Sequence, residues 1–142
     1  MQTTEVGINL IKKWEGYREK AYKDVGGVCT IGWGHTKNVC ESDVINEDIA
    51  TSYLNEDVKE AEEIIIKHVK VELTNNQFDA LTSWAFNVGG NAVKNSTLVA
   101  MLNNKQYDNV PEQLARWNKV GGKTIAGLIK RRADEAVLWN TG

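Results

Sequence analysis

The chain has 142 residues, of which 42% are hydrophobic and 25% are charged, and this is typical of one globular domain with a real core. Its formal net charge of −2 argues against a dedicated nucleic-acid-binding protein. The composition leaves the class of activity open, so the predicted elements and their motifs have to supply it.

The first predicted helix begins near the N-terminus. Apolar residues recur at helical spacing from Val6 to Trp14, and Thr3 or Thr4 is in the right place to cap the helix. The helix is expected to end by Gly16 or soon after, because a glycine-rich segment follows.

That segment predicts short strands joined by tight turns. Residues 21–36 show the alternation of half-buried strands. Within nine of these residues the chain places four glycines: Gly26, Gly27, Gly32 and Gly34. Glycines at this density indicate tight turns and close backbone approach, as a binding site needs.

Helices account for the rest of the prediction. Asn46 is expected to cap a long helix whose first turn carries acidic residues, and Thr74 with Gln77 forms a capping box for the next one. This second helix is apolar nearly all round, so we expect it to be the buried central helix, ended by glycines 89 and 90. Further helices are predicted near residues 98–102, 111–117 and 125–139.

The fold class predicted from these elements is α+β and mainly helical. We expect a single domain over residues 1–142, with a small N-terminal β-hairpin lobe (about 14–60), a long connecting helix, and a helical lobe (about 61–142 together with the N-terminal helix). No internal repeat or low-complexity linker divides the chain.

Charge is distributed unevenly along the chain. Acids dominate from Glu41 to Glu63, where Lys59 is the only Lys or Arg. Residues 116–132 hold six basic residues and no acid, which suits an anionic polymer or cell surface, or else forms a solvated helix face.

Two carboxylates in the glycine-rich region are candidates for chemistry. Glu15 is predicted at the C-terminal end of the first helix, where the helix dipole and the neighbouring Trp14 disfavour an ionised carboxylate and favour a general acid. Asp24 is predicted in a polar turn, where it more naturally stays ionised. Thr30 is placed to hold a water against Asp24. Carboxyls in contrasting environments are typical of an acid–base pair, although acids near a helix end are common.

Longer strings make a more specific argument. The stretch "EGYREKAYKDVGGVCTIGWGHT" has eight residues between Glu15 and Asp24, and five between Asp24 and Thr30. It resembles the catalytic motif of the phage-type lysozymes, glycoside hydrolase family 24. The strings "NQFDALTSWAFNVG", "NSTLVAMLN" and "GGKTIAGLIKRR" are similar to the helical lobe of that family in order and spacing. The resemblance covers nearly the whole chain, and it is to the compact phage endolysins.

This resemblance implies a lysozyme-like two-lobe fold and a muramidase activity. The expected reaction is hydrolysis of the β-1,4 bond between N-acetylmuramic acid and N-acetylglucosamine in bacterial peptidoglycan, with inversion and without a metal or cofactor. Glu15 would protonate the leaving oxygen, while Asp24 and Thr30 would handle the water. An inverting site has its carboxyls about 6.5–9.5 Å apart.

The resemblance also suggests substrate-binding residues. Arg131, in preference to Arg132, is expected to approach Glu15 across the cleft. Four further positions are candidates for lining the sugar cleft, although Phe86 is as well explained as core: Phe86, Asn87, Thr97 and Gln113. For Trp33 and Trp117, packing is favoured over stacking on sugar.

A structural ion pair is also predicted from the resemblance. His35 ends the strand segment, and Asp57 lies about three turns into the long helix, at an acidic position facing this histidine. We expect a partly buried salt bridge that lowers the pKa of Asp57 and stabilises the fold most between about pH 4 and 6.5. The alternative is that Asp57 is one more solvated acid.

Several expectations concern cysteines, partners and location. Cys29 and Cys40 lack metal-ligand spacing and are better explained as core or free thiols than as a disulfide, which stays possible. No apolar run is long enough to span a membrane, and the N-terminus does not resemble a signal peptide. We therefore expect a protein that is made in the host cytoplasm. The family resemblance implies that it reaches the periplasmic cell wall through a holin, and we expect it to be a monomer.

Two other classes of function are weighed against a lysozyme. One is a carbohydrate-binding module that holds glycan without cutting it. The other is a lytic transglycosylase, which leaves anhydro-muramyl ends. The presence of both acids argues against the first, and the presence of Asp24 and Thr30 to handle a water argues against the second.

Overall fold

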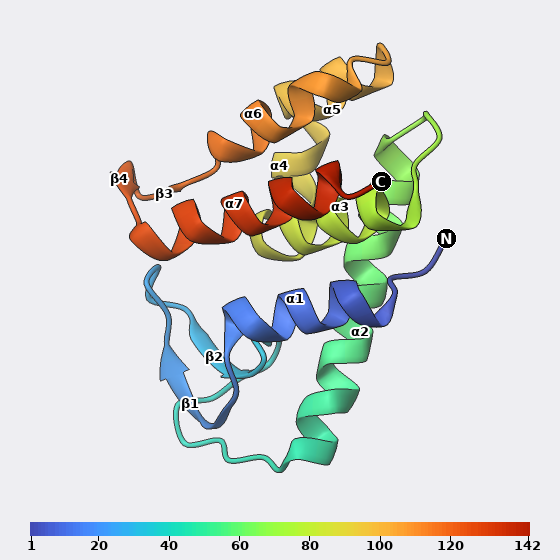
Figure 1. The fold of residues 1–142 in the computed structure, drawn as a ribbon. Coiled ribbons are helices and arrows are strands. Elements are labelled where there is room, and N and C mark those ends of the chain that lie inside the picture. Colours follow the sequence, from blue (N-terminus) through green and yellow to red (C-terminus); the bar gives the residue numbers. More distant parts are fainter.

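The computed structural model describes residues 1–142 as helices packed around one central helix, with two small hairpins (Figure 1). In chain order the elements are α1 (Glu5–Glu15), β1 (Arg18–Lys23), β2 (Cys29–Gly32), α2 (Glu47–His68), α3 (Asn75–Val88), α4 (Gly90–Lys94), α5 (Thr97–Asn103), the 3-10 helix η1 (Tyr107–Asn109), α6 (Val110–Ala115), β3 (Lys119–Val120), β4 (Lys123–Thr124) and α7 (Ala126–Asn140). The predicted α+β, mainly helical fold class is confirmed. None of the helices is long and apolar enough to cross a lipid bilayer.

The start of α1 differs from the predicted cap. Thr4 occupies the N-cap position, but its hydroxyl makes no cap and instead donates to the carboxylate of Asp79 on α3. The amide and hydroxyl of Thr3 both donate to Glu62 Oε2 on α2, at 2.6 Å. Acids from two neighbouring helices thus hold the end of α1, because hydrogen bonds to a carboxylate are stronger than those to a neutral hydroxyl.

Strands β1 and β2 form the predicted hairpin, with a shifted boundary. They pair antiparallel, with Arg18 opposite Gly32 and Lys23 opposite Cys29, and the register shifts between Arg18 and Tyr22. The first strand begins at Arg18, earlier than the expected residue 21, because Gly16 ends α1 at a φ of 68° and the chain turns at once. The irregularity explains why simple alternation did not indicate this start.

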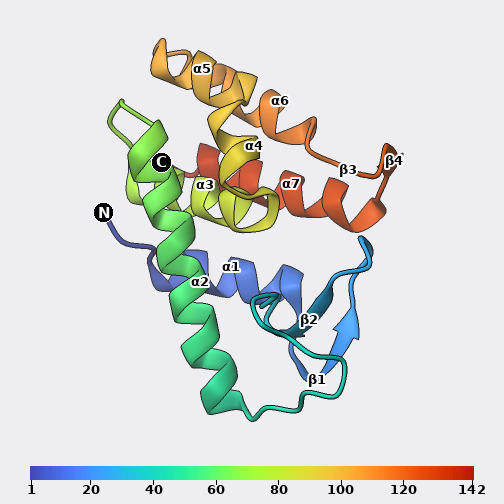
Figure 2. The same cartoon turned by 180° about the vertical axis from the view of Figure 1, so that it is seen from behind.

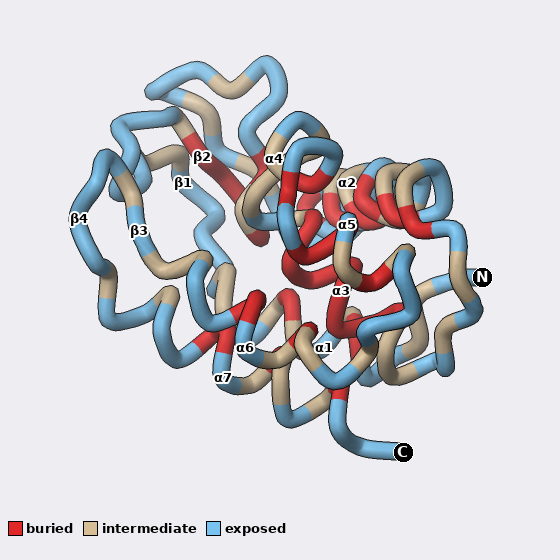
Figure 3. Tube along the Cα trace, turned by 90° about the horizontal axis from the view of Figure 1, so that it is seen from above, coloured by how far each residue is buried: buried red, intermediate tan, exposed pale blue.

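Helices α2 and α3 follow their sequence signals. The Asn46 side chain accepts the Ile49 amide hydrogen at 2.9 Å, and Thr74 with Gln77 forms both hydrogen bonds of the capping box. Every residue of α3 from Phe78 to Ala85 is buried, and Figure 3 shows buried positions gathered along this helix. The glycine prediction is half right, since Gly89 ends α3 whereas Gly90 begins α4.

Two hydrophobic clusters make up the core. The larger one surrounds α3 and includes Trp84, Leu98 and Trp139. The smaller one joins α1, the hairpin region and the first half of α2, through Ile11, Trp33, Leu54 and neighbours. Seen from behind, α2 runs from the hairpin region up beside the other helices (Figure 2). The chain therefore has a hairpin side and a helical side, joined by α2.

The hairpin β3–β4 was not predicted from the sequence. Its two strands have only two residues each, and Lys119 pairs with Thr124. Gly121 and Gly122 between them have φ values of 57° and 80°, the left-handed conformation that a two-residue hairpin turn requires. The tip of the β1–β2 hairpin lies near this region and the start of α7 in both views (Figures 1 and 2).

Candidate functional site

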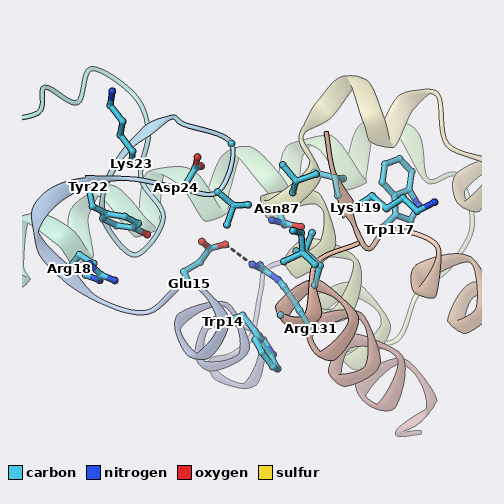
Figure 4. Close-up of a pocket in the computed structure, with 17 residues that line it drawn as sticks. Trp14, Glu15, Arg18, Tyr22, Lys23, Asp24, Asn87, Trp117, Lys119 and Arg131 are labelled. Carbon is cyan, nitrogen blue, oxygen red and sulfur yellow. Dashed lines mark hydrogen bonds and ion pairs between the residues drawn. The ribbon is translucent and has the colours of Figure 1, made fainter. Parts of the chain in front are cut away.

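A cleft of about 720 Å³ separates the β1–β2 hairpin from the helical side (Figure 4). Its lining comes from the end of α1, the hairpin and its turn, the end of α3, the β3 region and the first turns of α7. Segments far apart in sequence thus meet at one concave surface, which is typical of a ligand site. The residues labelled in Figure 4 that line it are Trp14, Glu15, Arg18, Tyr22, Lys23, Asp24, Asn87, Trp117, Lys119 and Arg131.

Glu15 is the last residue of α1 and lines this cleft, with only 17% of its side chain exposed. Arg131 Nη1 donates to its Oε2 at 2.6 Å. Gly34 has a φ of 73°, and a Cβ there would lie 2.7 Å from Glu15 Cδ. A glycine is therefore required at this position both by the backbone conformation and by the carboxyl packed against it.

Asp24 faces the cleft from the hairpin turn, and unlike Glu15 it is exposed. Its Oδ1 accepts the amide hydrogen of Val28 at 2.9 Å, which fixes the carboxylate to the turn. Burial raises the pKa of the nearby Tyr22 hydroxyl, and the charges of Glu15 and Asp24 add to this effect while Arg18 opposes it. The two carboxyls thus differ in exposure, as the sequence predicted.

Thr30 does not line the cleft. It is 3% exposed, and its hydroxyl donates to the carbonyl of Val28 at 2.8 Å. Because the amide of Val28 donates to Asp24, the side chains of Thr30 and Asp24 hold the same residue of the turn from its two polar groups. Cys29, next to Thr30, is a free thiol of intermediate exposure, and Cys40 is free and exposed.

Next to Glu15 lies a buried polar cluster, which we call the Arg131 cluster: Arg131, Arg132 and Glu135 on α7, together with Ser83 on α3. Both arginines contact the fully buried Glu135 carboxylate, and the Ser83 hydroxyl donates to it at 2.6 Å. Burial raises the pKa of Glu135, against the opposing effect of the two arginines, and burial lowers the pKa of Arg132 to about 10. The predicted approach of Arg131 to Glu15 is present, but a solvated face for Arg131 and Arg132 is wrong, because α7 packs this side on α3.

Of the other predicted substrate-binding residues, the structure places only one in the cleft. Asn87 lines the cleft beside Arg131. Phe86 instead packs against both hydrophobic clusters and borders a neighbouring pocket of about 230 Å³ that also contacts Gly34. Thr97 is exposed at the start of α5 and Gln113 is buried in α6, and neither lines the cleft.

Sequence reasoning did not select several residues of the cleft. Arg18 and Tyr22 enter it from β1, and the Arg18 guanidinium lies 4.6 Å from the Tyr22 ring centroid. Trp14 and Lys119 also line it. Their place on the elements beside Glu15 and Asp24 was the available signal for β1. For β3 the available signal was the pair Gly121 and Gly122, which is typical of a two-residue hairpin turn. Trp33 is core, as favoured, and Trp117 both packs edge-on against Trp84 and borders the cleft.

His35 and Asp57 form the predicted ion pair, with His35 Nδ1 2.8 Å from Asp57 Oδ2. The His35 ring stacks on Tyr53. The expected lowering of the Asp57 pKa is wrong. Burial raises this pKa above the ordinary 3.8, and the contacts with His35 and Lys37 only partly offset the loss of water. No cluster of three or more His, Cys, Asp or Glu side chains is arranged to hold a metal ion.

Comparison with known proteins agrees with this geometry. The phage lysozyme family model matches residues 12–135. The endolysin of Bacillus phage B103 is 45% identical over 145 residues, in a match that covers all of this chain and 55% of the endolysin, so this chain spans about half the length of that relative. A second Bacillus phage endolysin, from phage PZA, is covered to 56%.

Solved structures give the same result. A mutant of P22 lysozyme superposes with a TM-score of 0.82 at 36% identity, over 98% of each chain. The muramidase domain of SpmX from Asticaccaulis excentricus superposes with a TM-score of 0.90 at 32% identity, over 99% of each chain. On the extent of these matches, the chain belongs to the phage lysozyme family.

Proposed function

We propose that this protein is an endolysin muramidase, which hydrolyses the β-1,4 bond between N-acetylmuramic acid and N-acetylglucosamine in bacterial peptidoglycan with inversion at the anomeric carbon. The observation that carries the proposal is the cleft itself, in which the largely enclosed Glu15 and the exposed Asp24 face one cavity from different elements. Membership of the phage lysozyme family supports it further.

In this reaction Glu15 is the general acid. Its carboxyl, held between Gly34 and Arg131, donates a proton to the oxygen of the leaving sugar. Asp24, in its exposed turn, activates a water on the opposite face of the ring, as an inverting site requires. Thr30 lies outside the cleft lining, and we propose that it contributes by holding the turn that carries Asp24, through the hydrogen bond that its buried hydroxyl donates to the Val28 carbonyl.

Substrate binding is proposed for the residues that border the cleft, with Asn87 and Arg131 closest to the chemistry, whereas Phe86, Thr97 and Gln113 lie outside its lining. We further propose that residues 1–142 act as a single catalytic domain and as a monomer. In the proposed lytic cycle the protein is made in the host cytoplasm and reaches the periplasmic wall with the help of a holin.

Mass analysis of purified peptidoglycan digested with the protein tests this function. A muramidase releases fragments with reducing N-acetylmuramic acid ends, each heavier by one water than the anhydro-muramyl products of a lytic transglycosylase. Binding without any released fragment would instead identify a carbohydrate-binding protein. Proton NMR of the first product formed from a chitooligosaccharide reports whether the anomeric configuration is inverted.

A further inference from the structure

Arg131 is held at three points on the side of the cleft where Glu15 lies. Its Nη1 donates to Glu15 Oε2 at 2.6 Å, its Nη2 donates to the Ser83 carbonyl at 3.0 Å, and its Nε donates to Glu135 Oε2 at 3.4 Å. Its side chain is 4% exposed. The guanidinium therefore lies between a carboxylate in the cleft and a carboxylate in the core.

Glu135 has a more unusual position than Arg131. Its side chain is fully buried and lies outside the cleft lining, so it has no contact with substrate. It accepts from Ser83 Oγ at 2.6 Å and from Arg132 Nη2 at 3.2 Å, and its Oε1 lies 2.7 Å from Arg132 Nε. A fully buried carboxylate is costly unless several donors surround it. Here the donors are Arg131 itself, its partner Ser83 and its chain neighbour Arg132.

We propose that Glu135 is a positioning residue for the catalytic acid. It fixes Arg131 against Glu15, and it offsets one of the two positive charges of the buried arginines. The proposal rests on the muramidase function proposed above.

The reason is a balance of charge in the Arg131 cluster. Two arginines and Glu135 leave one net positive charge facing Glu15. Without Glu135 there would be two, in a region where water screens little. A nearby cation favours the ionised form of a carboxyl, yet a general acid has to carry its proton when substrate arrives. Glu135 thus limits how strongly the arginines hold Glu15 as an anion.

Other charged and titratable groups that line the cleft remain unchanged in such a comparison. They come from the hairpin and from the β3 region on the opposite wall of the cleft, and α3 contributes only the uncharged Ser83 and Asn87 there. These groups are Arg18, Tyr22, Lys23, Asp24 and Lys119.

The test is the pH dependence of kcat/KM for release of reducing ends in wild type, Glu135→Gln and Arg132→Gln. In Glu135→Gln the limb on which activity falls with rising pH should move about one unit lower, so activity at pH 7 falls about tenfold while it is retained in more acidic solution. In Arg132→Gln the charge change is opposite, so the same limb should move to higher pH. KM should change little in both, because neither residue borders the cleft.

The matched control is Glu112→Gln. Glu112 forms the same kind of pair, to Arg116 four residues away, but both side chains are exposed. The Glu112→Gln variant should leave the pH profile of kcat/KM at its wild-type position. Glu135→Asp keeps the charge and should also keep the wild-type limb.

Circular dichroism and thermal melting establish which variants fold. Limbs that stay in place in folded Glu135→Gln or Arg132→Gln would overturn the proposal, and failure of both variants to fold would assign the cluster to stability alone and overturn it too. If only one of the two variants folds, the direction in which its activity limb moves along the pH axis decides whether the proposal stands. An inactive wild type would instead count against the muramidase function, so the two failures are distinct.

Discussion

Two buried charge groups lie on either side of Glu15 and differ in what they touch. The Arg131 cluster on α7 reaches into the cleft through the contact of Arg131 with Glu15. The pair of His35 and Asp57 joins the hairpin region to α2 and does not border the cleft. Gly34 stands between them in the structure, next to His35 in the chain and against the Glu15 carboxyl. Similar burial of charge thus serves the proposed chemistry in one place and the connection of two sides of the fold in the other.

The largest effect is expected on the cleft side from Glu15→Gln. The amide keeps the shape of the side chain but has no acidic proton to transfer, and general acid help is worth about 10²–10⁴ in rate. Clearing of permeabilised cells should be lost while the circular dichroism spectrum is unchanged. Near-normal clearing by this variant would contradict the proposed mechanism.

Asp24→Asn should be nearly as damaging, because an amide cannot activate the water, and this change lies outside both charge groups. Asp24→Cys should keep more activity than Asp24→Asn, since the family motif carries Asp or Cys at this position. Initial rates on the same peptidoglycan preparation rank the two variants. The reverse ranking would argue that Asp24 acts mainly through its hydrogen bond to Val28.

Gly34→Ala tests the point between the two groups. An L-residue at a φ of 73° costs about 1–2 kcal/mol, and the new methyl would displace the Glu15 carboxyl. Denaturant unfolding should show that loss of stability, and kcat should fall further than a stability change of this size explains. Gly27→Ala is the control, because Gly27 has a φ of 81° but no atom within 4 Å of its Cβ position. Equal activities of the two variants would contradict the close packing of Glu15.

Asp57→Asn tests the other group, where a change in stability rather than activity is expected. Because burial raises the folded pKa of Asp57, its contribution to stability is complete below its unfolded pKa and is lost as pH rises through the folded value. The free energy of unfolding of wild type relative to Asp57→Asn should therefore fall as pH rises from the ordinary pKa of 3.8 through the raised folded value. A relative stability that rises over this range would restore the lowered pKa expected from the sequence.

The smallest effect concerns the exposed basic residues of the helical side. Arg116, Lys119, Lys123 and Lys130 are exposed, and they should speed encounter with an anionic wall. Salt screens this attraction over about 10 Å at 0.1 M, so activity on cell walls should fall with salt while cleavage of a neutral chitooligosaccharide stays constant. Lys123→Gln should weaken the salt dependence, whereas Lys67→Gln at the far end of α2 should not. Equal salt dependence on both substrates would argue against long-range attraction.

Local signals in the sequence were sufficient for most of the elements. Helix caps such as Asn46 and the Thr74–Gln77 box act over three or four residues, so the sequence alone located α2 and α3. The apolar periodicity of α3 likewise predicted its burial. The spacing of Glu15, Asp24 and Thr30 pointed to the candidate site through its resemblance to a family, because the residues that line one wall of the cleft are close together in the chain.

Tertiary structure decided what depends on distant partners. Thr4, a candidate helix cap in the sequence, donates to Asp79 instead. Arg131 and Arg132, which the sequence placed in a basic stretch, are buried beside Glu135. Burial also raised the pKa of Asp57, where the sequence predicted a lowered one, because the loss of water outweighed the attraction of His35. In each case the sequence determined which charges and donors were available. Only the packing of helices far apart in the chain determined which of them met and how much water they kept.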